Sequence, residues 1–151
     1  MKKILFSFTL TLLFSSSSVL AEWKYLGEIS DQKIRFYIDT ENIKHIANEI
    51  FSFTTLEDFG REIVVGGGVF SIITDKQIDC ETYKFRNRHM RQFTGNMGTG
   101  EQIFVLDISG HREIGADIWF QIDQGGKNTW QNGLEIGSKG PLMFQNFICT
   151  N

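Results

Sequence analysis

After residue 22, apolar and polar residues alternate far more often than they follow a helical repeat. In residues 33–39 the side chains of Ile34, Phe36 and Ile38 fall on one side of an extended strand. Residues 23–29 precede this segment across a turn, so the two together predict a β-hairpin. The same pattern predicts further strands over residues 46–56, 69–78, 81–93, 103–108 and 116–122, with breaks at 57–60 and 95–100.

The C-terminal segment follows a different period. Its apolar residues recur at the spacing of one helical face: Leu142, Met143, Phe144, Phe147 and Ile148. Ser138 is a favourable N-cap, and Pro141 is tolerated in a first helical turn. These features predict a short helix that ends at Cys149.

The first 21 residues have the pattern of a secretory signal peptide. Lys2 and Lys3 precede an apolar run over residues 4–14, and Val19 and Ala21 form a small-x-small cleavage site. The run is shorter than the roughly 20 residues that a transmembrane helix needs. We therefore expect an exported protein, periplasmic or secreted to the cell surface, with one domain over residues 22–151. No cysteine near the cut supports a lipid anchor.

The net charge of the domain without its signal peptide narrows the classes of partner that it can bind. Removal of the signal peptide takes away two lysines and no acids, which leaves 13 basic and 18 acidic side chains and a net charge of −5. Such an acidic domain is a poor binder of nucleic acid or of anionic membranes. No second apolar segment follows, so we expect no stable membrane insertion.

Only two cysteines occur, Cys80 and Cys149, and in an exported chain they predict one disulfide. It would close a loop of 69 residues and tie the terminal helix to the sheet. The expected fold is thus α+β and mostly β: a single antiparallel sheet of about six strands with a short C-terminal helix held by this disulfide. The histidines have no metal-ligand spacing, so we expect neither a metal nor a cofactor.

Catalytic patterns are scarce. The chain has no Gly-x-Ser-x-Gly motif, and the disulfide would occupy both thiols. Residues 95–100 are rich in glycine but lack the Gly-Lys-Ser/Thr ending of a phosphate loop, which favours a turn over a ligand-binding loop. Asp58 and Asp79 are the carboxylates that a hydrolase would use, but caps of turns at strand ends are the favoured interpretation. We therefore predict a protein that is not an enzyme.

Basic residues at strand spacing form the main candidate binding site. Lys84, Arg86 and Arg88 alternate along one predicted strand, and Arg91 lies just beyond. Such a stripe suits a sulfated glycan, a lipid headgroup or an acidic partner. The alternative is a solvated sheet face that is balanced by acids on neighbouring strands.

Alternation in the same strand sends Tyr83, Phe85 and His89 to the other side, toward the core. Trp119 is the tryptophan with the strongest indication of exposure, because polar residues share its face of the strand over 116–122. Exposed aromatic residues of this kind mark a partner surface or a dimer interface.

Short segments, in order along the chain, carry a family resemblance. They are residues 23–27, 36–39 with Ile43, 56–59, 79–80, 83–86, 97–100, Trp130, 137–138 and 148–149. In this order they resemble the surface-adhesin E family of small exported bacterial proteins, from Trp23 to Cys149. The resemblance implies an antiparallel sheet with a short C-terminal helix and the binding of host matrix and plasma proteins. The chain departs from anchored members in lacking their lipid-attachment cysteine, and residues 100–130 form a longer segment.

Together these features predict an exported binding protein without enzymatic activity, which recognises host or matrix proteins or glycans. The alternative is a soluble periplasmic accessory protein that binds an envelope partner or a small ligand. Both interpretations leave open a homodimer.

Overall fold

The structure is a computed structural model, and it describes residues 21–30, 33–63, 68–107, 118–122, 129–131, 134–136 and 139–150. For residues 61–63, 129–131 and 134–136 it describes the backbone alone. The signal peptide expected over residues 1–21 lies outside the described residues except for its last residue, and so do His111 and Ser138. No described helix is long and apolar enough to cross a membrane.

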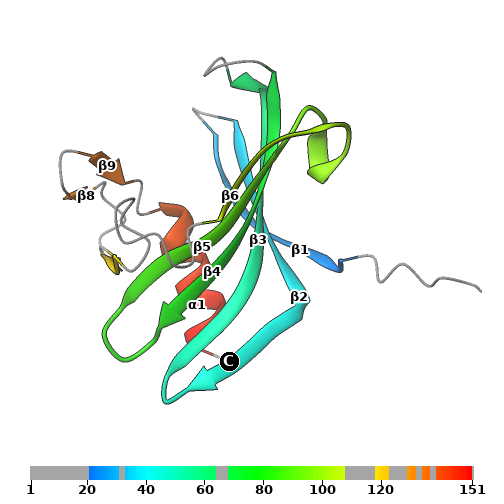
Figure 1. The fold of residues 1–151 in the computed structure, drawn as a ribbon. Coiled ribbons are helices and arrows are strands. Elements are labelled where there is room, and N and C mark those ends of the chain that lie inside the picture. The colour runs from blue at the N-terminus through cyan, green and yellow to red at the C-terminus, as the bar shows by residue number, and fades with distance from the viewer. Residues whose placement is uncertain are drawn as a thin grey trace, which may run out of the picture.

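Antiparallel pairing of successive strands builds the main sheet (Figure 1). Its six long strands, each paired with the next, are β1 (Trp23–Ile29), β2 (Ile34–Ala47), β3 (Ile50–Ile63), β4 (Val69–Asp79), β5 (Lys84–Phe93) and β6 (Gln102–Asp107). The short β7 (Phe120–Gln121) pairs with β5, whereas β8 (Thr129–Gln131) and β9 (Leu134–Ile136) pair with each other. A 3₁₀ turn, η1 (Asn96–Gly98), precedes β6, and the helix α1 (Lys139–Cys149) ends the fold. The predicted α+β fold is confirmed.

Strand boundaries differ from the prediction at three places. The predicted strand over residues 46–56 is divided by a turn at Asn48, whose φ of 47° suits asparagine, and β3 then continues through the predicted break to Ile63. β5 begins at Lys84 because a turn with a positive φ at Tyr83 precedes it. Of the strand predicted over residues 116–122, only Phe120–Gln121 is paired within the described residues.

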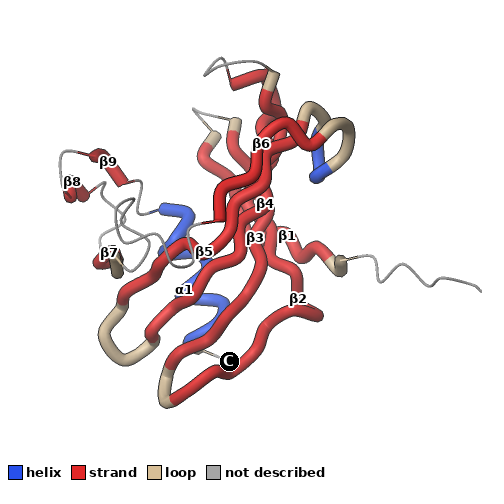
Figure 2. Tube along the Cα trace, viewed as in Figure 1, coloured by secondary structure: helices blue, strands red, loops and turns tan. Residues whose placement is uncertain are grey.

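α1 packs on one face of the sheet, and the core lies between them (Figures 1 and 2). The buried apolar side chains of this layer are Phe36, Ile38, Phe53, Ile78, Phe85, Ile122, Phe144 and Ile148. The Phe144 ring lies 6.0 Å from the ring of Phe36 and 5.8 Å from that of Phe53. Gly140 permits this close approach, because a Cβ at that position would lie 2.7 Å from the Phe36 ring.

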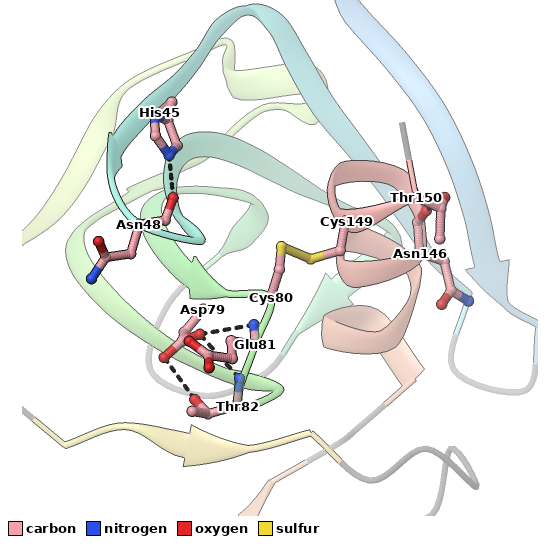
Figure 3. Close-up of a disulfide and its surroundings, with 9 residues drawn as sticks. All are labelled: His45, Asn48, Asp79, Cys80, Glu81, Thr82, Asn146, Cys149 and Thr150. Carbon is pink, nitrogen blue, oxygen red and sulfur yellow. Dashed lines mark hydrogen bonds between the residues drawn. A yellow bond between two sulfur atoms is a disulfide. The ribbon is translucent and has the colours of Figure 1, made fainter.

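The predicted disulfide between Cys80 and Cys149 is present and joins the end of β4 to the last residue of α1 (Figure 3). Asp79 fixes the turn that follows, since its carboxylate accepts hydrogen bonds from the backbone N–H groups of Glu81 and Thr82 and from the Thr82 hydroxyl. Partial burial raises the pKa of Asp79, but these hydrogen bonds and the charge of Lys84 outweigh it and lower the pKa. The predicted turn cap at Asp79 is thus confirmed.

Replacement of both cysteines, Cys80→Ser with Cys149→Ser, is expected to lower the free energy of unfolding by about 4 kcal/mol, because the 69-residue loop is no longer closed in the unfolded chain. Urea unfolding with and without a reductant checks this. Reductant should bring the natural chain to the stability of the variant and leave the variant unchanged. A variant as stable as the oxidised chain would contradict a stabilising disulfide.

Lys76 is a buried cation beneath the helix. Its Nζ donates a hydrogen bond to Asn87 Oδ1 at 3.0 Å and lies 3.7 Å from Glu57 Oε1. The rings of Phe85 and Phe144 lie 5.8 and 5.7 Å from the same Nζ. Burial lowers the pKa of Lys76, and the neighbouring Glu57 carboxylate opposes this effect only in part.

Because the folded-state pKa of Lys76 is lowered, the unfolded chain binds more protons between that pKa and the ordinary lysine value of about 10.4. Below this pH range Lys76 is protonated in both states, so the folded chain bears the whole free-energy cost of burying its charge. Above the range Lys76 is neutral in both states, and this cost is absent. The natural chain should therefore gain stability relative to Lys76→Met as pH rises toward the ordinary lysine pKa. Urea unfolding of both proteins at stepped pH measures the difference. Parallel stability curves would show that burial does not perturb this lysine.

Candidate functional site

The face of the sheet opposite α1, which we call the open face, carries polar side chains at one end. Towards its other end Leu56 is buried, and Gly98 of the loop before β6 lies against Ile73. Alternation places Ser52 and Thr54 of β3 on this face, paired in register with Gln77 and Asp75 of β4. The Thr54 hydroxyl donates a hydrogen bond to Asp75 Oδ1 at 2.8 Å. β2 and β5 flank these two strands, so the open face is built from four neighbouring strands (Figure 2).

The predicted basic residues gather on this face. Arg86 is paired in register with Gln77, and its Nε donates a hydrogen bond to Gln77 Oε1 at 2.7 Å. The Arg86 guanidinium also lies 4.5 Å from the centre of the Trp119 ring, which is half-buried. Lys84 lies at the same end of β5, paired in register with Asp79. The structure thus brings Trp119, a predicted exposed aromatic residue, against the basic stripe.

A β-bulge in β5 changes the rest of the stripe. Asn87 is paired with Lys76 and His89 with Asp75, so Arg88 is the extra residue between them. The bulge reverses the alternation beyond this point and sets His89 Nδ1 3.5 Å from Asp75 Oδ2. The prediction that His89 faces the core is therefore wrong.

Two further orientations were predicted for this strand. Phe85 is buried in the core, as predicted. Tyr83 is exposed instead of core-facing, because it belongs to the turn before β5 and not to the strand. Arg91 lies on the open face with an Nη2 3.5 Å from Asp75 Oδ1, so a neighbouring acid does balance this end of the stripe.

At the other end of the open face, Asp58 organises the loop between β5 and β6. Its carboxylate, 1% exposed, accepts hydrogen bonds from Arg35 Nη2 at 2.6 Å, Asn96 Nδ2 at 2.9 Å and the Met97 N–H at 2.8 Å. Asp58 was predicted to cap a turn at the end of its own strand, and this prediction is wrong. Asp58 lies inside β3 and caps a loop that is distant in sequence.

The Ser71 hydroxyl fastens the same loop. It donates to the Gly95 carbonyl at 2.5 Å and accepts from the Gly98 N–H at 2.9 Å. Gly98 has a φ of 72°, and a Cβ there would lie 2.7 Å from the Ile73 side chain. The predicted turn over residues 95–100 is confirmed, and glycine is required where it presses on the sheet.

Asp58 and Asp79 do not form a catalytic pair. In the pairing of β3 with β4, Asp58 lies opposite Ser71, whereas Asp79 lies opposite Ile50. Eight residues of β4 therefore separate the two positions, a distance of about 27 Å at the rise of an extended strand. Among the described residues, no group of three His, Cys, Asp or Glu side chains could hold a metal ion.

Sequence reasoning missed two surface features. The first is a pocket of about 350 Å³ on the open face, to which Lys44 of β2 and Arg88 of β5 contribute. These residues are far apart in sequence, and only the sheet order brings them together. The second is β6, which lies at the edge of the sheet formed by the described residues; Ile103, Phe104 and Val105 are 38%, 45% and 48% exposed. Their unbroken apolar run, in place of alternation, is the signal that could have identified this edge.

Comparison with known proteins decides the family. The sequence model of surface-adhesin protein E matches residues 23–130, more than half of the chain. The chain belongs to the surface-adhesin protein E family. The resemblance found in the sequence is therefore confirmed, and the adhesin E match extends over all strands from β1 to β7.

Solved structures of Haemophilus influenzae protein E are similar to this adhesin E chain. Crystal form II is 15% identical, with a TM-score of 0.49, and the match covers 84% of this chain and 87% of that one. Protein E from a non-typeable strain is 16% identical, with a TM-score of 0.41 and coverage of 58% and 67%. No curated protein sequence matches the chain.

Asp58→Ala is expected to lower the free energy of unfolding by about 3 kcal/mol, because it removes three hydrogen bonds to a buried carboxylate. The Met97 amide should then exchange its hydrogen faster. Asp75→Ala is the matched control: this half-exposed carboxylate should contribute less than about 1 kcal/mol. Urea unfolding and hydrogen exchange measure both effects. Equal losses in the two variants would contradict the organising role of Asp58.

Proposed function

We propose that this adhesin E family member is an exported binding protein without enzymatic activity, which recognises a host or matrix protein or a glycan through the open face of its sheet. The observation that carries the proposal is the division of the sheet into two faces. α1 and the disulfide occupy one face, whereas one end of the other face presents polar and basic side chains from four neighbouring strands. Such a face suits a binding surface, because no rearrangement of the core is needed to reach it.

Lys84, Arg86 and Trp119 are the proposed centre of this surface. Trp119 packs on the Arg86 guanidinium, so the arginine is held in place before a partner arrives. Tryptophan and arginine are also the residue types that contribute most to binding energy at protein interfaces. Arg88 and Arg91 extend the basic surface along β5, and Asp75 reduces the charge at the Arg91 end.

Export supports this interpretation. The family is one of surface adhesins, and structural disulfides are typical of oxidising compartments outside the cytoplasm. Cell fractionation with surface-protease accessibility separates the two locations that the sequence predicts. Surface exposure favours direct adhesion, whereas a protected periplasmic pool favours the accessory protein that binds an envelope partner.

The homodimer stays a prediction. β6 is the surface that suits it best, because an edge strand with three exposed apolar side chains can pair with another strand. Binding through the open face does not require this dimer, since β6 contributes no residue to the proposed centre.

The double variant Lys84→Gln with Arg86→Gln should bind an immobilised basement-membrane extract about tenfold more weakly than the natural chain. The matched control is Lys24→Gln with Lys139→Gln. It also removes two charges, but Lys24 lies over the Phe147 ring of α1 and Lys139 begins that helix. Surface plasmon resonance at two salt concentrations measures both variants. Equal weakening in the control, or none in the open-face variant, would count against the proposed surface.

A further inference from the structure

The pocket on the open face lies between two cations that come from different strands. Its lining comprises Asn42, Lys44, Ser52, Phe53, Thr54, Asp75, Lys76, Gln77 and Arg88. Lys44 belongs to β2 and Arg88 to β5, the outer two of the four strands that form this face. The volume of about 350 Å³ is at the small end of the range for ligand pockets, so it suits one substituted ring and not a large ligand.

Register places four of the side chains on this face in one straight row. Lys44 is paired with Ser52, Ser52 with Gln77, and Gln77 with Arg86. Three strand spacings separate the two ends of the row, which makes it about 14 Å long. The row runs across the strands and presents, in order, a cation, a hydroxyl, an amide and a second cation.

The acid in the pocket is already engaged. The Asp75 carboxylate accepts a hydrogen bond from Thr54 and lies within 3.5 Å of both Arg91 and His89. The Arg91 guanidinium therefore offsets part of this carboxylate's charge from outside the pocket lining. Lys44 and Arg88 add two cationic side chains to the lining, although the chain as a whole is acidic.

We propose that this pocket binds a sulfate group of a sulfated glycan whose chain lies along the row. Charged substituents alternate with hydroxyl groups in such a glycan, and this alternation matches cations that are separated by neutral donors. The indole of Trp119, stacked on Arg86 at one end of the row, offers an apolar surface for a sugar ring.

An acidic peptide fits the pocket less well. The backbone groups of β3 and β4 are paired on both sides within the sheet, so a peptide cannot add to this face as a strand. Its recognition would depend on side-chain contacts, and its carboxylates present no ring to the indole of Trp119. The glycan satisfies both the cations and the neutral donors.

The sulfate site deepens the proposed function, on which it rests, and isothermal titration calorimetry with a heparin hexasaccharide tests it. Lys44→Gln and Arg88→Gln should each weaken binding about tenfold, because each removes a charge-assisted hydrogen bond. Lys139→Gln, which removes one exposed charge at the start of α1, should bind as the natural chain does. Circular dichroism of each variant verifies that the sheet is intact.

Three results would overturn the sulfate site: equal weakening by Lys139→Gln, equal binding of the desulfated hexasaccharide, or equal binding of a polyglutamate of the same charge. The last would identify an acidic protein as the better ligand. These failures differ from a failure of the proposed function. Suppose that Lys84→Gln with Arg86→Gln abolishes binding to the matrix extract while Lys44→Gln changes nothing. The open face is then still the binding surface, but the pocket is not a sulfate site.

Discussion

The packing of α1 against one face of a single sheet is the constraint on which the rest of the structure depends. Phe144 contacts rings from β2 and β3, and Gly140 lets the helix approach closely enough for this contact. Cys149 then holds the end of the helix to the end of β4. The helix buries the apolar residues of one face, and on the other face the loop before β6 lies against Ile73 beside the buried Leu56. The remaining end of that face can therefore carry polar residues.

Period-2 patterning and the two cysteines predicted most of this architecture. The alternation of Ile34, Phe36 and Ile38 identified the side of β2 that faces the core, and the exported chain with two thiols predicted the link to the helix. These features are local or, for the disulfide, have a single solution. The ordered segments that resemble the adhesin E family independently predicted an antiparallel sheet with a C-terminal helix, and the family match confirms that resemblance.

The binding face was predicted only in part, because its decisive features are not local. Nothing in the alternation of Lys84, Arg86 and Arg88 reveals that Arg88 is a bulged residue, since a bulge is defined by the partner strand. Lys44 joins Arg88 only through the order of β2, β3, β4 and β5. Likewise, the burial of Lys76 contradicts the usual preference of lysine for solvent, and only the helix above it and the Asn87 and Glu57 partners explain it.

The distribution of acids explains how an acidic chain presents a basic face. Asp58 is buried and bonded to Arg35 and to the loop before β6, and Asp79 is directed into its own turn. Asp39, also buried, accepts hydrogen bonds from the Glu41 N–H and the Asn42 side chain. The carboxylates of Asp58 and Asp39 are buried, so they contribute less to the field outside the protein than acids on the surface do. The local charge that a partner meets is therefore set by the cations of β2 and β5, and net charge alone is a poor guide to the partner of this chain.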